Sequence, residues 1–280
     1  MTEDMARSAA GRNQMFKTRL ISGVILVALA LLFIIIGGNL LLVVSAILSV
    51  IGLFELYRVF RIEKTPVAIC GYLFTIFYYI KLGNNNIPFL LLIMAFLLAI
   101  LIIFVIRYPR YRSQHIMAAF FGVFYVSIML SCVYQTRMLP EGGIYLVWLI
   151  FLSAWGSDTC AYCAGMLFGK HKMTPKLSPK KTIEGAIGGI VGAAILGLIY
   201  GAIFHGPMNI GSREIVILAI VCAVGAVIAM IGDLCASAIK RNYKVKDYGH
   251  LIPGHGGVMD RFDSIIFTAP VILYLSIFFL

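Results

Sequence analysis

A short polar stretch, residues 237–263, interrupts the apolar pattern of this chain. It holds five Lys or Arg residues, three Asp, two His and four Gly, although only 12% of the chain is charged. Cationic side chains and closely approaching glycine amides bind anions, and short carboxylates suit Mg²⁺. This combination predicts phosphate-transfer chemistry at a membrane surface.

Three aspartates are the candidate metal ligands. Asp260 and Asp263 share one face at the start of an expected helix, and Asp233 interrupts the preceding apolar run. A carboxylate inside a membrane span costs about 2.5–3.5 kcal/mol on insertion scales, so Asp233 indicates function. We therefore expect these three residues to hold Mg²⁺, with room for a second cation. For Asp260 and Asp263, a purely structural interaction with the helix macrodipole is the alternative.

Cations and glycines around these aspartates are the candidate phosphate ligands. Ser237 and Lys240 follow Asp233 on one helix face, and Gly256 and Gly257 would let backbone amides approach an anion. The cations that would neutralise phosphate charge are Lys240, Arg241, Lys244, Lys246 and Arg261.

A second polar segment, residues 169–184, adds another phosphate candidate. Ser178 followed by Pro179 predicts the N-cap and first turn of a helix, whose free amides would meet a triphosphate together with Lys180 and Lys181. The glycine spacing does not match a Walker A loop. A soluble P-loop kinase is therefore excluded.

The chain as a whole is 61% hydrophobic, which is typical of a polytopic membrane protein. Long apolar runs without period-2 alternation favour helices over a barrel, so the expected fold class is all-α. No small-residue cleavage site follows the first run, and we expect that run to be retained. The nine expected spans are 20–37, 39–57, 67–82, 88–106, 116–136, 144–168, 185–205, 214–239 and 264–280.

The Lys and Arg residues predict the orientation of these spans. Of 23 such residues, 20 fall before the first span or after the second, fourth, sixth and eighth. The positive-inside rule then places the N-terminus and loops 169–184 and 240–263 in the cytoplasm. We expect two parts, a multi-span region over residues 1–140 and a catalytic region over residues 141–280.

Two further acidic residues lie within expected spans. Asp158 is a candidate functional carboxylate. Glu55 lies near a cytoplasmic span end beside Arg58, so a local ion pair and a functional role both stay open.

Three motifs resemble the CDP-diacylglycerol synthases, also called phosphatidate cytidylyltransferases. The main one runs from Ser237 to Asp263 and includes Lys246-Asp247 and His255-Gly256-Gly257. The others begin at Ser157-Asp158 and at Ser178-Pro179-Lys180-Lys181, the last ending in Glu184-Gly185. The resemblance includes Ser237 and Asp158, and it adds Asp247, His255 and Glu184 to the candidate site. His255 would either donate a hydrogen bond to a phosphate group or only form hydrogen bonds within the loop.

The resemblance implies Mg²⁺-dependent transfer of a cytidylyl group from CTP to phosphatidate, giving CDP-diacylglycerol and pyrophosphate. It also implies an inner-membrane enzyme with its active site facing the cytoplasm, working as a homodimer on membrane lipid, with no nucleic-acid partner. Two alternatives remain. A CTP-dependent polyprenol kinase would release CDP, and a transporter would use its intramembrane acids for ion passage.

Overall fold

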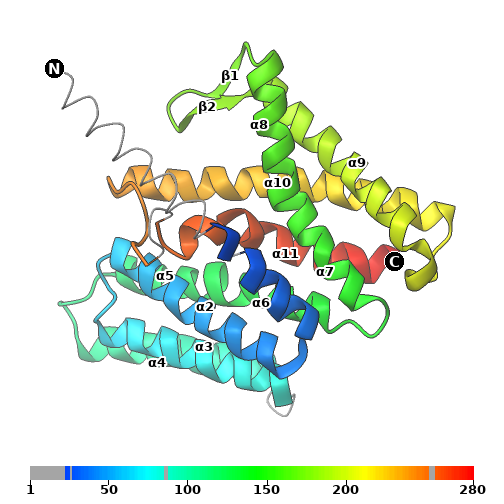
Figure 1. Ribbon diagram of the computed structural model, residues 1–280. Coiled ribbons are helices and arrows are strands. Elements are labelled where there is room, and N and C mark those ends of the chain that lie inside the picture. Colours follow the sequence, from blue (N-terminus) through cyan, green and yellow to red (C-terminus); the bar gives the residue numbers. More distant parts are fainter. Residues whose placement is uncertain (1–22, 26, 85–87, 252–255) are drawn as a thin grey trace, which may run out of the picture.

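In the computed structural model, residues 23–25, 27–84, 88–251 and 256–280 are described, and most of them are helical (Figure 1). The predicted all-α membrane fold is confirmed. Eight helices, two of them continuous through a π-helical segment, are long and apolar enough to cross a bilayer. The elements are α2 (Gly38–Val59), α3 (Pro66–Asn84), α4 (Phe89–Ile106), α5 (Ser113–Gly122), η1 (Val123–Ile128), α6 (Met129–Arg137), α7 (Gly143–Phe151), η2 (Leu152–Gly156), α8 (Ser157–Phe168), β1 (Lys172–Thr174), β2 (Ser178–Thr182), α9 (Ile183–Met208), α10 (Ser212–Asn242) and α11 (Met259–Phe279).

The eight helices correspond to the second to ninth predicted spans. The first predicted span, 20–37, overlaps a shorter apolar helix over residues 23–36. Part of that segment lies outside the described residues, so the exact number of crossings and the N-terminal orientation stay predictions.

Short connections lie at the two opposite ends of the bundle (Figure 1). Segments 60–65 and 107–112 lie at the same end as the connection between α10 and α11, and segments 138–142 and 209–211 lie at the other end. This alternation agrees with the uneven distribution of Lys and Arg along the chain.

Two hydrophobic cores meet at α2. The first, within the N-terminal part, includes Leu53 and Tyr57 of α2 and residues of α3, α4 and α5. The second includes Leu56 of α2 and residues of α6, α7, α10 and α11. Helix α2 therefore contacts both parts of the chain, and α11 packs on α6 across the predicted boundary near residue 140.

Small residues bring α8, α9 and α10 close together. Buried Gly185, Gly189 and Gly197 recur on one face of α9. A Cβ at Gly189 would lie 3.0 Å from the Ser157 carbonyl oxygen, and one at Gly197 would lie 2.9 Å from that of Leu218. Without side chains at these positions, helix backbones pack directly, as is common in membranes. This packing places η2, which continues into α8, beside α10.

Candidate active site

The segment before α9 folds as a β-hairpin in which β1 pairs with β2. The prediction that Ser178 and Pro179 begin a helix is wrong. Ser178 begins β2 instead, and α9 begins five residues later with Thr182 as its N-cap, whose Oγ1 accepts a hydrogen bond from the Gly185 amide at 3.2 Å. Pairing of Ser178 with Thr174 across the hairpin holds this segment extended.

Glu184, in the first turn of α9, binds the hairpin. Its carboxylate accepts hydrogen bonds from the backbone amides of Lys170 (3.1 Å) and His171 (3.2 Å). The His171 ring nitrogen Nδ1 lies 2.6 Å from Oε1. These contacts give Glu184 a role in holding the hairpin, while its predicted contact with substrate stays a prediction.

The hairpin reaches α10 through one ion pair. Lys181 of β2 pairs with Asp233 of α10, and both side chains are partly buried. Ser237 follows one turn later on the same helix and is also partly buried. The hairpin and the second half of α10 thus lie side by side, although α9 separates them in the sequence.

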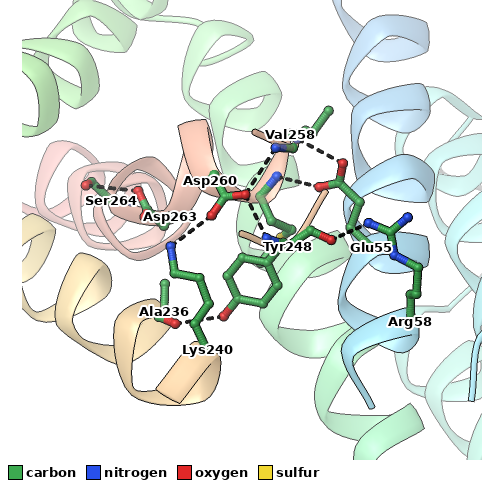
Figure 2. A network of polar contacts seen from close by, with 11 residues as sticks. Glu55, Arg58, Ala236, Lys240, Tyr248, Val258, Asp260, Asp263 and Ser264 are labelled. Atoms are coloured by element: carbon green, nitrogen blue, oxygen red, sulfur yellow. Dashed lines mark hydrogen bonds and ion pairs between the residues drawn. The ribbon is translucent and has the colours of Figure 1, made fainter. Parts of the chain in front are cut away.

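Asp260 lies at the centre of a second polar network (Figure 2). Its Oδ1 accepts a hydrogen bond from Lys240 Nζ at 2.8 Å, in an ion pair that is almost fully buried on the Asp260 side. Its Oδ2 accepts bonds from the amides of Tyr248 (2.8 Å) and Gly257 (3.1 Å). A Cβ at Gly256, where φ is +85°, would lie 2.9 Å from this oxygen. Asp260 therefore organises the loop that precedes α11.

Asp263 lies one turn further along α11. Its Oδ1 accepts a hydrogen bond from the Ser264 amide at 2.8 Å, and the residue is buried. It lines one cavity together with Asp158, and Asp158 lines a second cavity with Lys181, the ion-pair partner of Asp233. Helices α8, α10 and α11 thus each contribute one carboxylate, Asp158, Asp233 and Asp263, to the same region of the structure.

The carboxylate set suits Mg²⁺ in its chemistry. Within the described ranges, no three Asp, Glu, His or Cys side chains converge enough to surround an ion by themselves. Mg²⁺ is usually bound by one or two carboxylates together with substrate phosphates and water, so Asp233 and Asp263 would be sufficient. Both carboxylate oxygens of Asp260 already accept hydrogen bonds from protein donors. The predicted metal ligands Asp233, Asp260 and Asp263 therefore stay a prediction.

Two cavities meet at Asp158. The larger, of about 420 Å³, lies between α8, α9, α10 and the hairpin, and its polar lining includes Lys180 and Lys181. The smaller, of about 240 Å³, is lined by Asp260, Arg261 and Asp263. Asp158 lines both. The two phosphate-binding segments predicted from the sequence therefore line adjoining spaces.

Comparisons with known proteins point to the same kind of chemistry as these cations, carboxylates and cavities. A model described as the cytidylyltransferase family matches residues 17–279. A phosphatidate cytidylyltransferase from Staphylococcus aureus (strain COL) is 34% identical over 267 residues, covering 93% of this chain and 99% of that protein. One from Staphylococcus haemolyticus has the same identity and coverage. One from Rickettsia felis is 43% identical over 141 residues, half of this chain and 62% of that protein. The chain belongs to the cytidylyltransferase family.

This cytidylyltransferase is therefore a nucleotidyltransferase and a multi-pass membrane protein, as predicted, within the family that the motifs resemble. Four other predicted site residues lie at the edge of the cavities or beyond them. Arg241 and Lys246 are exposed, Asp247 is partly buried, and exposed Arg261 lines the smaller cavity. His255 lies outside the described residues.

Tyr248 is a residue of the candidate site that sequence reasoning missed. Its hydroxyl donates to the Ala236 carbonyl oxygen at 3.0 Å, and its ring lies 5.3 Å from Lys240 Nζ. Burial raises the pKa of the Tyr248 phenol, so the hydroxyl keeps its proton and remains a donor. An aromatic residue within a polar stretch was the signal that the sequence offered.

Proposed function

We propose that this cytidylyltransferase transfers a cytidylyl group from CTP to phosphatidate, releases pyrophosphate and requires Mg²⁺. The observation that carries this proposal is the match with full-length phosphatidate cytidylyltransferases over 93% of the chain. The paired cations and carboxylates beside two adjoining cavities support it, because both substrates carry phosphate charge.

In the proposed reaction, a phosphate oxygen of phosphatidate forms a bond to the α-phosphorus of CTP. The bond from that phosphorus to the oxygen bridging the α- and β-phosphates breaks, and pyrophosphate leaves with the electron pair. No protein nucleophile is required, so the task of the chain is alignment and charge neutralisation.

The side chains divide this task by position. Lys180 and Lys181 line the larger cavity, where they would hold the triphosphate of CTP. Lys240, Arg241, Lys246 and Arg261 would offset the charge of the reacting phosphates. Mg²⁺ held by Asp233 and Asp263 would stabilise the charge that develops on phosphate oxygens. Apolar residues in the larger cavity, among them Met166 and Ile190, suit acyl chains.

The products distinguish this reaction from that of a CTP-dependent polyprenol kinase. Purified protein in detergent, given CTP and phosphatidate, is expected to release pyrophosphate and to form CDP-diacylglycerol. Removal of divalent cations with EDTA is expected to stop the reaction, and added Mg²⁺ to restore it. Release of CDP in place of pyrophosphate, with a polyprenol as acceptor, would instead assign the chain to the kinases.

We also propose that the enzyme works as a homodimer in the inner membrane, with the hairpin facing the cytoplasm. The distribution of Lys and Arg supports this orientation. In intact cells, Lys176→Cys on the exposed hairpin turn is expected to resist an impermeant thiol reagent, whereas Glu141→Cys in the exposed turn at the opposite end should react. Inverted vesicles should reverse the pattern. The opposite result in both preparations would invert the proposed topology.

A further inference from the structure

We infer that Glu55 of α2 is a positioning residue that holds the connection between α10 and α11 in its reactive shape. This inference rests on the proposed function for the role of that loop. Glu55 is only 3% exposed, and each of its carboxylate oxygens accepts one hydrogen bond from the start of α11. Oε1 accepts from the Val258 amide at 3.1 Å, and Oε2 from the Met259 amide at 2.9 Å.

The N-terminus of α11 explains why a carboxylate occupies this place. The first amides of a helix have no partner within the helix, and the dipole favours negative charge there. Asp260 accepts from the Gly257 amide, whereas Glu55 accepts from the next two amides. The charge that caps α11 therefore comes from a helix about 200 residues earlier in the chain.

Two glycines make room for the Glu55 carboxylate. A Cβ built at Gly249 or Gly257 would overlap its oxygens, so a side chain at either position would displace Glu55 or the loop. Two described loop positions, Gly249 and Gly257, therefore lie directly against the carboxylate. The glycines of this stretch, which the sequence suggested for anion binding, thus also accommodate an anion of the protein itself.

Arg58, one turn after Glu55, provides a second attachment. Its Nη2 donates to the Tyr248 carbonyl oxygen at 2.6 Å, and the Tyr248 amide in turn donates to Asp260. Figure 2 shows Glu55 and Arg58 reaching the loop from α2, on the side of Asp260 opposite Lys240. Helix α2 therefore holds the loop at two places, at Tyr248 through Arg58 and at Val258 and Met259 through Glu55.

This geometry decides between the two roles left open for Glu55. The ion pairs between described residues are those of Glu184, Asp233 and Asp260, and Glu55 forms none with Arg58. Both residues act on the loop instead. Since Asp260 and Lys240 depend on the loop conformation, Glu55 acts on catalysis through Asp260 and without contacting substrate. The N-terminal part of the chain thereby contributes to the reactive site.

Glu55→Gln tests this inference, because the amide nitrogen of Gln cannot accept a bond from a backbone amide. Hydrogen exchange in a peptide covering residues 256–262 is expected to accelerate at least about tenfold, whereas peptides from α3 and α9 stay unchanged. We expect kcat to fall about 10–100-fold, as for other residues that orient a reactive group, and KM for CTP to stay within about twofold.

Glu63→Gln, the same change in the turn after α2, is the matched control and should leave both measurements unaltered. Unchanged exchange in Glu55→Gln would overturn the inference, and so would faster exchange with normal kcat. If Glu55→Gln does not fold, Arg58→Ala replaces it, because Arg58 is exposed and holds the same loop. Faster exchange in the loop together with a lower kcat would support the inference. Normal exchange and a normal kcat would overturn it. The exchange measurement needs no substrate, so it stays informative even if the proposed reaction is wrong.

Discussion

Replacing Asp260 or Asp263 by Asn is expected to reduce turnover by about 10²–10³-fold, the range typical for loss of one preorganised electrostatic group in an active site. The two losses have different physical causes. Asp263→Asn removes a charge from the cavity that Asp263 shares with Asp158, where Mg²⁺ and phosphate would bind. Asp260→Asn leaves Lys240 without its charged partner in a largely buried position.

The second cause also predicts a difference in stability. Breaking a buried ion pair by removing one partner costs about 3–5 kcal/mol, so Asp260→Asn should lower the thermal stability of the detergent-solubilised protein. Asp263 forms no ion pair with any described residue, so Asp263→Asn should unfold close to the wild-type temperature.

The measurement is CDP-diacylglycerol formation by purified variants whose elution from size exclusion matches the wild type. Glu141→Gln, an acid-to-amide change at the opposite end of the bundle, is the control and should retain full activity. Near-normal turnover in both Asp variants would remove these residues from the reactive site.

Lys181→Ala is expected to reduce turnover by about 10²-fold, the second-largest effect. The change removes a cation from the larger cavity and leaves the partly buried Asp233 without its partner. Lys181→Arg keeps the charge and should restore part of the activity. Lys180→Ala, which removes an exposed cation from the same cavity, should have a smaller effect.

Steady-state kinetics with varied CTP distinguishes these effects. Lys176→Ala, in the exposed turn of the hairpin and outside the cavity lining, is the matched control and should behave as wild type. If Lys181→Ala retained more than half of the wild-type kcat/KM, the hairpin would have no part in catalysis.

The sequence by itself determined the class of fold and the family, and it predicted where the chemistry would take place. Apolar runs long enough to cross a bilayer are a local property of the chain, because helix rise and membrane thickness set their length. The polar stretch at residues 237–263 stood out for the same reason, since charged groups are rare in such a chain. Its motifs also indicated the family, which the match over residues 17–279 confirms.

Only the tertiary structure decided which groups meet. Asp233, Lys240 and Asp260 were all predicted as site residues, but their partners depend on how α10 crosses α11 and where the hairpin lies. The start of α9 at Ile183 was missed because strand pairing between Ser178 and Thr174, a contact outside the local pattern, overrode the Ser-Pro signal.

Glu55 shows the physical reason most clearly. From the sequence, its nearest opposite charge was Arg58 on the same helix, and spacing alone allowed an ion pair. In the fold, both residues bind a loop about 200 positions later, because packing of α2 between the two cores brings the N-terminus of α11 within hydrogen-bonding distance. Local patterns predict which groups can react, whereas helix packing decides which of them are brought together.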